Sequence, residues 1–423
     1  MTKKIIVAGG GTGGHLFPGI AVVEEMRRRL DVDVLFVGTE RGIEARVLPG
    51  RGERVEFLEV TPLKGRSAGQ LMQSLGRLPR AAIQAGGVVR AHQADLVLGV
   101  GGYASGPVLA AAAAMGTPTA VLEQNAHLGL TNRMLAPVVG RGYVTFESTL
   151  GRFGKRGRLV GNPVRREFAE AARRAAIDPV GFEARANTIL VMGGSQGAKA
   201  LNETVPTALA AAHRRGLHVV HQTGAAMRDE VEARYEELGV SATVVSFIDD
   251  MAQAYAAASL VIARAGASTL AELCAVGRPS ILVPYPFAAD DHQRKNAEAL
   301  EAKGAAICIP QDELRVHDLA STLDTLLGDP NRRRSLADAA RREGRPDAAA
   351  AIVDDLCSWL DWSERTPTAS APPSKGGSDE EPEEPVQRSR LRGERHYTPQ
   401  LSSSVAAARP RRPLVFDGSF VWE

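Results

Sequence analysis

The sequence predicts an α/β protein with two doubly wound domains that face a cleft, followed by a disordered C-terminal tail. Three observations support this prediction. Short apolar runs alternate with helical stretches, a glycine loop follows the first run, and the pattern restarts halfway along the chain with a second glycine loop. At 423 residues the chain also exceeds what one hydrophobic core usually organises, so two domains are expected.

The candidate strands form two series, each with helical stretches between its members. The first series is 4–8, 34–37, 96–100, 119–122 and 142–146. The second series is 188–192, 219–222, 244–247, 260–263 and 280–283. Such alternation is typical of parallel sheets covered by helices on both faces, and ligands of these sheets bind at the carboxyl ends of the strands. We therefore expect residues 1–160 and 161–346 to be two domains with a ligand site between them.

The last part of the chain differs in composition. Residues 363–423 are rich in proline, serine, arginine and acidic residues, which predicts a disordered tail. Its final residues include Phe416, Phe420 and Trp422 and form a candidate docking motif. A lineage-specific tail without such a role is the alternative.

Composition argues against several classes of protein. The net charge of +2 argues against bulk binding of nucleic acid. No stretch of about 20 apolar residues is present and the N-terminus lacks a signal-peptide pattern, so we expect no membrane span. The three cysteines lie far apart without metal-ligand spacing. Asp31 and Asp33 form a DxD pattern that can hold a metal, but they flank the start of a strand and are interpreted as turn residues. We expect neither a metal nor a cofactor.

The first glycine loop, 9–14 (GGGTGG), lies between a strand and a helix start and is followed by His15. Its glycines let backbone N–H groups approach an anionic ligand, and the helix N-terminus adds roughly half a positive charge. The GxGxxG spacing is also that of a dinucleotide site, with Glu40 as the acid for the ribose. His15, Pro18 and the second glycine loop at 193–197 (GGSQG) weigh against that alternative.

Two further segments follow predicted strands. Residues 99–107 (GVGGYASGP) form a third glycine loop, which is either a plain turn or part of an anion site shared with the first loop. Residues 263–272 (ARAGASTLAE) begin a helix in which Thr269 and Glu272 fit a capping box. In the functional alternative, the Glu272 carboxylate accepts hydrogen bonds from a ribose diol.

One basic segment points to a lipid surface. Residues 60–94 contain no Asp or Glu, and apolar residues recur at helical spacing among the basic ones. A basic amphipathic helix of this kind lies on anionic membranes, whereas an ordinary helix packed on the core is the alternative. The candidate membrane residues are Lys64, Leu71, Leu75, Arg77 and Arg80.

Taken together, the loops resemble the MurG family, the bacterial peptidoglycan glycosyltransferases of glycosyltransferase family 28. The resemblance covers about residues 3–360 and leaves the tail unassigned. It depends on six motifs in the family's order: 10–18 (GGTGGHLFP), 99–107, 123–125 (EQN), 161–165 (GNPVR), 193–198 (GGSQGA) and 264–272 (RAGASTLAE).

The resemblance implies a GT-B fold, in which two Rossmann-like domains face a cleft and a C-terminal helix (348–360, within 347–362) packs back on the first domain. It implies transfer of N-acetylglucosamine from UDP-N-acetylglucosamine (UDP-GlcNAc) to the C4 hydroxyl of the muramyl sugar of lipid I, with inversion, giving lipid II. It also implies peripheral attachment to the cytoplasmic face of the bacterial inner membrane. The tail would then be a candidate contact for cell-wall or division proteins.

The family's UDP-GlcNAc site maps onto residues Thr12, Gly13, Gly14, Asn125, Arg165, Ser195, Ile248, Ala267, Ser268, Thr269, Leu270, Ala271, Glu272 and Gln293. The resemblance makes Ile248 the position whose backbone recognises uracil and Glu272 the ribose acid. Arg165 and Ser195 suit the charge of the UDP leaving group. His292 is a weaker candidate because family members differ there.

The acceptor side rests on fewer residues. Gly102 and Tyr103 are candidates for the acceptor diphosphate, and residues 12–14 fit either that diphosphate or the donor sugar. His15 is the candidate general base, since the ordinary pKa of histidine is about 6.5. Its place at a helix N-terminus equally fits a contact with the acceptor's phosphates. Three rival activities remain open: glycosylation of a diacylglycerol, epimerisation of a UDP-sugar, and nicotinamide-dependent oxidoreduction.

Overall fold

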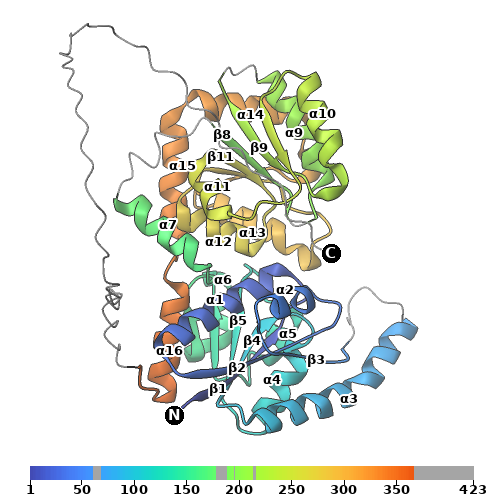
Figure 1. Ribbon diagram of the computed structural model, residues 1–423, viewed down its shortest axis with the longest axis vertical. Helices are drawn as coiled ribbons and strands as arrows, with labels where there is room; N and C mark the ends of the chain where they lie inside the picture. Colours follow the sequence, from blue (N-terminus) through green and yellow to red (C-terminus); the bar gives the residue numbers. More distant parts are fainter. Residues whose placement is uncertain (61–67, 178–187, 195, 213–215, 366–423) are drawn as a thin grey trace, which may run out of the picture. The chain divides into compact units, whose positions relative to one another are not determined.

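The computed structural model describes residues 1–60, 68–177, 188–194, 196–212 and 216–365. The chain up to Thr366 forms one compact unit that contains two parallel sheets with helices against them (Figure 1). The predicted α/β class with two parallel-sheet halves is confirmed. From residue 366 onward, the predicted tail lies outside the described residues.

The first sheet has seven strands in the order β3-β2-β1-β4-β5-β6-β7, and all of its pairings are parallel. The strands are β1 (Lys3–Gly9), β2 (Val32–Gly38), β3 (Val55–Phe57), β4 (Leu96–Gly101), β5 (Thr119–Glu123), β6 (Arg141–Val144) and β7 (Gly157–Leu159). Its helical elements are α1 (Gly13–Arg29), α2 (Glu44–Gly50), α3 (Ala68–His92), α4 (Ser105–Ala114), α5 (Leu130–Leu135), α6 (Glu147–Leu150) and η1 (Gly151–Arg156).

The second sheet has six strands in the order β10-β9-β8-β11-β12-β13, again parallel throughout. The strands are β8 (Thr188–Met192), β9 (His218–Gln222), β10 (Ala242–Val245), β11 (Ala258–Ala263), β12 (Ser280–Leu282) and β13 (Ile307–Cys308). Its helices are α7 (Arg166–Ile177), α9 (Lys199–Ala211), α10 (Arg228–Glu237), α11 (Met251–Ala257), α12 (Ala267–Val276), α13 (His292–Glu301), α14 (Val316–Gly328) and α15 (Pro330–Glu343), with the short turns η2 (Ala225–Met227), η3 (Ala289–Asp291) and η4 (Gln311–Glu313). One more helix, α16 (Ala348–Leu360), follows them in the chain.

The central strands are the ones that the sequence predicts most clearly. Ile5 of β1 pairs with Val34 on one side and Leu96 on the other, and all three side chains are buried. A strand covered on both faces must be apolar along its length, and such a run is visible in a sequence. The three strands that the sequence analysis missed, β3, β7 and β13, each have two or three residues and lie at sheet edges, where no long apolar run is required.

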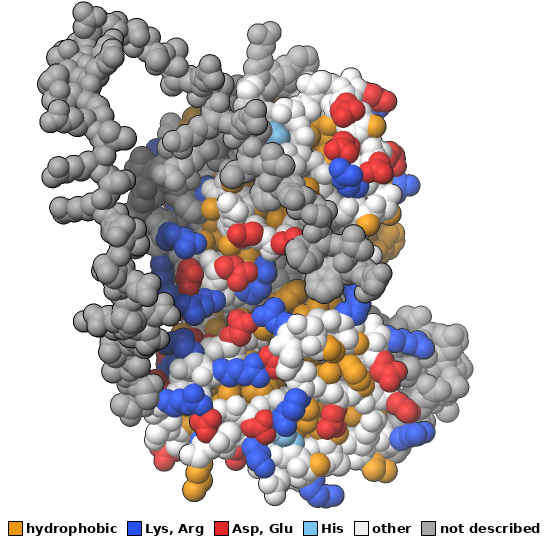
Figure 2. All heavy atoms as spheres, in the orientation of Figure 1, with side chains coloured by type: hydrophobic (Ala, Val, Ile, Leu, Met, Phe, Trp, Pro, Cys, Tyr) orange, Lys and Arg blue, Asp and Glu red, His pale blue; other side chains and the backbone are white. Residues whose placement is uncertain are grey.

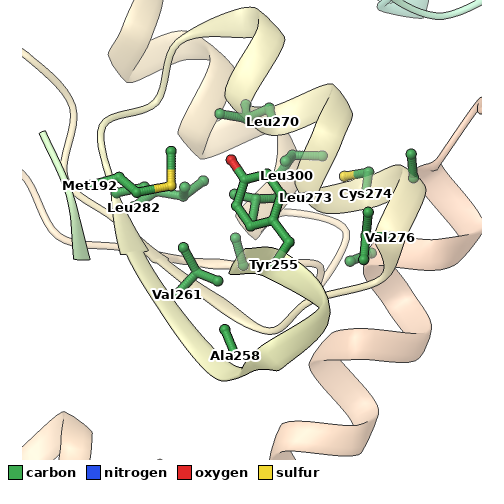
Figure 3. Close-up of a cluster of buried hydrophobic side chains, with 14 of the residues drawn as sticks. Met192, Tyr255, Ala258, Val261, Leu270, Leu273, Cys274, Val276, Leu282 and Leu300 are labelled. Carbon is green, nitrogen blue, oxygen red and sulfur yellow. The ribbon is translucent and has the colours of Figure 1, made fainter. Parts of the chain in front are cut away.

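A tyrosine lies at the centre of the core between the second sheet and its helices. The ring of Tyr255 is fully buried among Leu270, Leu273 and Cys274 (Figure 3). A buried phenol hydroxyl needs a polar partner. The partner of the Tyr255 hydroxyl is the carboxylate of Glu272 on α12, at 3.4 Å.

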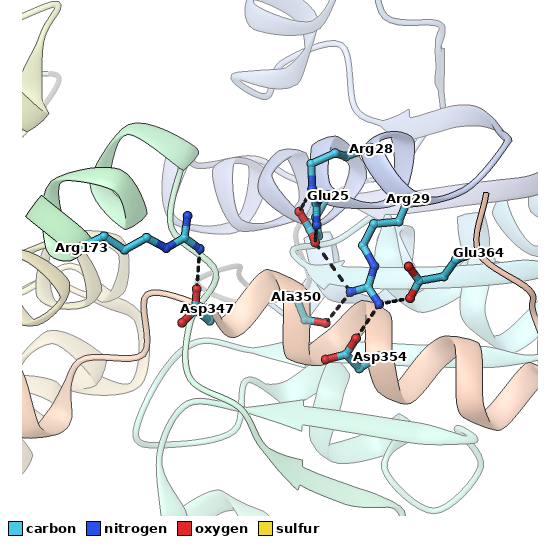
Figure 4. Close-up of polar contacts among 8 residues, drawn as sticks. All are labelled: Glu25, Arg28, Arg29, Arg173, Asp347, Ala350, Asp354 and Glu364. Atoms are coloured by element: carbon cyan, nitrogen blue, oxygen red, sulfur yellow. Dashed lines mark hydrogen bonds and ion pairs between the residues drawn. The ribbon is translucent and has the colours of Figure 1, made fainter. Parts of the chain in front are cut away.

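The last helix, α16, packs on the first half of the chain. Ile352, Val353 and Leu356 are fully buried in the same core cluster as Ile5 of β1. Arg29 of α1 donates a hydrogen bond to the carbonyl oxygen of Ala350 on α16 at 3.3 Å. The Arg29 guanidinium also forms ion pairs with three carboxylates around it (Figure 4). These carboxylates are Glu25, Asp354 and Glu364.

Asp355 joins α16 to the edge of the first sheet. Its carboxylate accepts hydrogen bonds from Arg141 Nε (2.9 Å) and Tyr143 Oη (2.9 Å) on β6 and from Arg158 Nε (2.7 Å) on β7. Although partial burial alone would raise the pKa of Asp355, these three bonds lower it overall. Trp359 adds to the contact, because its ring lies 4.6 Å from the Arg141 guanidinium.

The described surface mixes both signs of charge. On the face shown in Figure 2, Lys and Arg side chains are interspersed with Asp and Glu, in keeping with the net charge of +2. Several large apolar side chains are exposed, including Ile83 at 78% and Met134 at 70%. Within the described ranges, no helix combines the length and apolar character needed to cross a bilayer.

We predict that Asp355→Ala destabilises the protein by about 1–3 kcal/mol, because it leaves the buried Tyr143 hydroxyl and the Nε donors of Arg141 and Arg158 without this acceptor. The control is Asp354→Ala on the same helix, whose carboxylate is 64% exposed and should cost less than about 1 kcal/mol. Thermal unfolding near pH 7 measures both. Since the pKa of Asp355 is lowered in the folded state, its contribution is present at neutral pH and is lost as the pH falls through the acid range. Equal losses for the two variants would contradict the assignment.

Candidate functional site

The segments singled out by the sequence lie where parallel strands end. In the first sheet, β1, β4 and β5 end at Gly9, Gly101 and Glu123, and the first glycine loop, the third glycine loop and the EQN segment begin there. In the second sheet, β8 and β11 end at Met192 and Ala263, next to the second glycine loop and the start of α12. Because the strands of each sheet are parallel, these segments lie together at the carboxyl end of the strands of their sheet. Ligands of such sheets bind at this end.

The first glycine loop leads directly into α1. Thr12 is the N-cap residue with an extended backbone (φ −132°), and its carbonyl oxygen accepts from the N–H groups of His15 (3.2 Å) and Leu16 (3.1 Å). Gly13 and Gly14 fall in the first turn, where N–H groups have no acceptor within the helix. The start of this 17-residue helix therefore presents donors to an anionic group.

The third glycine loop packs against the first. The N–H of Gly10 donates to the carbonyl oxygen of Gly101 at 3.1 Å. A Cβ atom on Gly102 (φ +82°) would collide with the carbonyl oxygen of Gly10, so only glycine allows this approach. Tyr103, the next residue, is 47% exposed. The proximity of the two loops that the sequence predicts is thus present, and Tyr103 stands beside it.

Glu44 fixes the first loop from behind, a role that the sequence analysis missed. Its buried carboxylate accepts from the N–H of Gly11 at 2.6 Å and from the N–H and hydroxyl of Thr39 at 2.8 and 3.0 Å. Because Glu44 already accepts the hydrogen bond of the Gly11 N–H, that donor is not open to an anionic ligand. The donors that remain open are the N–H groups of residues 12–14. Nothing in the local sequence distinguishes Glu44 from the exposed Glu40 nearby.

His15 lies on the first turn of α1 against the third loop. Its Nδ1 is 3.1 Å from Thr12 Oγ1, and a Cβ on Gly101 would come within 2.7 Å of its Cδ2. Burial, and secondarily the nearby His292, lower the pKa of His15 to about 4. The imidazole is therefore neutral at pH 7.

Arg165 precedes α7 and lies between aromatic rings. Its guanidinium carbon is 4.8 Å from the ring centre of Phe168 and 5.8 Å from that of Phe17 on α1. It forms ion pairs with Glu167 at 2.9 Å and Glu272 at 3.7 Å. Its Nε is buried and has no hydrogen-bond partner among the described residues. A cation held in this way can bind a phosphate through the donors that remain.

Glu272 points back toward Tyr255 and Arg165 rather than to the start of its helix. Its carboxylate accepts from the Tyr255 hydroxyl at 3.4 Å. The capping-box alternative is wrong, because α12 begins at Ala267 after Gly266, which places Thr269 and Glu272 inside the helix. Burial raises the pKa of Glu272 to about 7, and Arg165 opposes part of that rise. A carboxyl with few partners is available to accept hydrogen bonds from a ligand.

The first turn of α12 carries more of the predicted donor residues. Ala267, Ser268 and Thr269 fall in that turn, and Leu270 and Ala271 follow directly. The Ser268 hydroxyl is buried, and no described residue is its hydrogen-bond partner. The side chain of Ile248 is packed in the core of the second half, so a ligand there would meet its backbone.

Asn162 is a second residue of interest that the sequence did not predict as part of the site. Its side chain is 3% exposed, and neither of its amide atoms has a partner among the described residues. Buried amides without partners are rare in proteins and often mark a place for a ligand or water. The residue lies inside the GNPVR segment that carries Arg165, so the motif itself was the available signal.

The EQN segment contacts the second half of the chain through α13. Asn125 Oδ1 accepts from the side chain of Asn296 at 3.1 Å, and Asn296 Oδ1 accepts from the N–H of Ala126 at 2.8 Å. Gln293, one turn earlier on α13, accepts from the N–H of Tyr285 at 2.9 Å. The sequence analysis did not select Asn296, because its role depends on contacts with residues about 170 positions away that no local pattern shows.

Several predicted residues have no side chain among those described. Ser195 and Lys64 lie outside the described residues. For Leu71, Leu75 and Arg77 the structure gives only their position on α3. Arg80 on the same helix is 78% exposed and lies 3.7 Å from Glu59.

The DxD residues lie at the amino end of β2, away from the carboxyl ends of the strands; Asp31 precedes the strand, whereas Asp33, which was interpreted as a turn residue, is its second residue. Asp31 and Asp33 are at the amino end of β2, where they contact Thr2 and Arg54. In the part of the chain that the structure describes, no three His, Cys, Asp or Glu side chains gather as a metal site would require.

Comparisons with known proteins cover both halves. Residues 5–144 match the glycosyltransferase family 28 N-terminal domain, and residues 188–352 match the glycosyltransferase family 28 C-terminal domain. A protein from Sorangium cellulosum is 48% identical over 360 residues, which are 83% of this chain and 87% of that one. A protein from Myxococcus xanthus is 45% identical over 355 residues, covering 83% and 91% of the two chains.

Both relatives are named UDP-N-acetylglucosamine–N-acetylmuramyl-(pentapeptide) pyrophosphoryl-undecaprenol N-acetylglucosamine transferase. Among solved structures, the crystal structure of Acinetobacter baumannii MurG matches with a TM-score of 0.70 and 30% identity. That match covers 84% of this chain and 99% of the other. The similarity therefore extends across both sheets and the segments at their edges.

Proposed function

The chain belongs to glycosyltransferase family 28 and has the GT-B fold of its MurG relatives, and from this premise we propose its reaction. It transfers N-acetylglucosamine from UDP-GlcNAc to the C4 hydroxyl of the muramyl sugar of lipid I and so makes lipid II. The observation that supports this most directly is the 45–48% identity, over 83% of the chain, to proteins named for that transfer.

The second half supplies groups suited to the donor. Glu272 can accept hydrogen bonds from the ribose diol, and the start of α12 presents backbone N–H groups to the diphosphate. Arg165 adds a cation next to Glu272, 3.7 Å from its carboxylate. As the bond between the anomeric carbon and the phosphate oxygen breaks, negative charge collects on the departing UDP, and preformed donors of this kind stabilise it.

The first half supplies groups suited to the acceptor. The N–H groups of residues 12–14, with Gly102 and Tyr103 of the adjoining loop, form the candidate site for the lipid diphosphate. The C4 oxygen forms its bond to the anomeric carbon from the face opposite to UDP, which inverts that centre. Its proton passes to the neutral imidazole of His15. The low pKa of His15 keeps it in the base form at neutral pH and also makes it a weak base.

One assay tests the proposed reaction. Labelled UDP-GlcNAc is incubated with a short-chain lipid I analogue in buffer containing a chelator, and label is followed into the lipid fraction. Transfer supports the proposal. Epimerised donor would favour a UDP-sugar epimerase, label on diacylglycerol in a parallel reaction that supplies this lipid in place of the lipid I analogue would favour a diacylglycerol glycosyltransferase, and measurable NAD binding would favour an oxidoreductase. UDP released without transfer to an acceptor would also contradict the proposal.

We predict that wild-type affinity for UDP-GlcNAc increases as the pH rises from 6 to 8. The carboxyl of Glu272 has a pKa of about 7, so it is mostly neutral below that pH and mostly ionised above it, and the carboxylate is the better hydrogen-bond acceptor. Glu272→Gln should abolish this dependence, and Glu272→Ala should raise KM for UDP-GlcNAc by about 10–100-fold. Calorimetry and steady-state kinetics measure both. A pH-independent wild type, or an unchanged KM in the alanine variant, would remove Glu272 from the donor site.

We predict that His15→Ala lowers kcat by about 10²–10⁴-fold, the range that a positioned base contributes, and leaves KM for UDP-GlcNAc nearly unchanged. Thr12→Val, which removes the hydroxyl next to His15 Nδ1, should lower kcat less, and Thr12→Ser should restore it. A His15→Ala enzyme with near-normal kcat but raised KM for the lipid I analogue would instead assign His15 to the acceptor phosphates.

Attachment to the cytoplasmic face of the membrane is also part of the proposal. On α3, Arg80 and Ile83 are both 78% exposed and lie three residues apart, hence on one face of the helix. A basic and apolar helix surface of this kind binds anionic lipid. The tail, as a contact for cell-wall or division proteins, falls outside the described residues.

We predict that replacing Arg77 and Arg80 with Glu weakens binding to anionic liposomes, because each basic side chain near an anionic surface contributes about 1 kcal/mol. The matched control is Arg228→Glu with Arg234→Glu on α10, which changes the net charge by the same amount. Flotation of full-length protein with liposomes measures the difference. Equal binding by the two double variants would return α3 to the role of an ordinary core helix.

A further inference from the structure

The buried side chain of Asn296 on α13 has no role in the function proposed above. It connects α13 to two other candidate donor-binding segments, the EQN loop and the loop before α12. We propose that Asn296 is a positioning residue for the transfer reaction: it holds the EQN loop of the first half against the donor-binding helices of the second half. This inference rests on the proposed function, because it concerns how the donor site is assembled.

Asn296 makes contacts in both halves of the chain. It is fully buried on α13. Its Nδ2 donates to Asn125 Oδ1 at 3.1 Å and lies 3.5 Å from the carbonyl oxygen of Ala265, and its Oδ1 accepts from the N–H of Ala126 at 2.8 Å. Ala265 comes just before the start of α12, so one amide contacts the loop after β5, the loop after β11 and its own helix.

The direction of these hydrogen bonds is fixed by Glu123. Its carboxylate accepts from the N–H and Nδ2 of Asn125 (3.1 and 3.3 Å), the N–H of Gly129 (3.0 Å) and Nδ2 of Asn132 (3.0 Å). A carboxylate can only accept, so the amide nitrogen of Asn125 must face Glu123 and its oxygen must face outward. Burial raises the pKa of Glu123, and these four donors oppose that rise and favour the ionised form.

The orientation of Asn296 follows from that of Asn125. Asn125 presents an oxygen to residue 296, and Ala126 presents an N–H. The side chain at position 296 must therefore place a donor against Asn125 and an acceptor against Ala126. An asparagine meets both requirements, whereas an aspartate of the same shape presents two acceptors. Glu123, Asn125 and Asn296 thus form a series of hydrogen bonds with a fixed donor–acceptor direction, here called the relay, which requires an amide at position 296.

The relay has a consequence for the donor sugar. Asn125 is a candidate contact to that sugar, and Gln293, another candidate, lies one turn before Asn296 on the same helix. A displacement of even 1 Å in a positioned group can cost about 10²-fold in rate. Loss of the Asn296 bond should therefore reduce activity without removing any group that touches the substrates.

The test compares Asn296→Asp with Asn296→Ala in the full-length enzyme at pH 8. Asn296→Asp keeps the shape but turns an acceptor toward Asn125 Oδ1, and we expect it to lower kcat/KM for UDP-GlcNAc by about 10–100-fold. Asn296→Ala removes the bonds without opposing them and should lose less. A role in packing alone gives the reverse order, since aspartate fills the site and alanine leaves a void.

The effect should disappear when the opposing oxygen is removed. In an Asn125→Ala background, Asn296→Asp should cost much less than in the wild type, which is the non-additivity expected of residues in direct contact. Glu298→Ala, on an exposed part of α13 where Glu298 pairs with Arg294, is the control for disturbance of the helix and should leave kcat/KM unchanged. Thermal unfolding of each variant establishes that it is folded.

Two outcomes would overturn the inference: Asn296→Asp at least as active as Asn296→Ala, or additive losses in the Asn125→Ala background. Both differ from failure of the proposed function, in which the wild type moves no label into lipid. In that case, calorimetry with UDP alone still compares the same variants, because the relay holds the donor-binding helices. Identical UDP affinity in all of them would then contradict the relay independently.

Discussion

The arrangement of the site depends on the parallel pairing of strands within each sheet. Parallel pairing brings all carboxyl ends of the strands to the same end of a sheet, so segments separated by many residues, such as the first and third glycine loops, become neighbours. It also restricts the backbone, because the loops after β1 and β4 approach too closely for any side chain at Gly102. Gly102 follows from this crowding, whereas the N–H groups at the start of α1 are open because the first turn of a helix has no acceptor for them.

Three buried or nearly buried carboxylates at these edges show how different partners give different roles. Glu44 and Glu123 are each surrounded by N–H donors and hold a loop in place. Glu272 has one hydroxyl donor and a guanidinium at 3.7 Å, and burial raises its pKa to about 7. A carboxylate whose acceptor positions are filled by the backbone is structural, whereas one with acceptor positions left open is suited to a ligand.

The sequence predicts the fold, the family and the general region of the site because these depend on local patterns. Apolar runs identify the central strands, and close-approach glycines identify the loops after them. The sequence cannot separate Glu44 from Glu40, since their difference in burial arises from packing between distant segments. Asn296 was missed for the same reason, as its partners are some 170 positions away. The capping-box hypothesis for Glu272 was local and plausible, and it was wrong because the helix begins two residues earlier than Thr269.

The position of α16 also affects how the protein is made. Ile352, Val353, Leu356 and Trp362 belong to the core of the first half, yet the whole of the second half is synthesised before them. During synthesis, the apolar surface of the first sheet that α16 covers stays exposed until the second half of the chain has also been made. Such partly finished domains are prone to aggregation and are typical clients of chaperones. A ribosome that stops before α16 would release a chain whose second half is complete but whose first half is not.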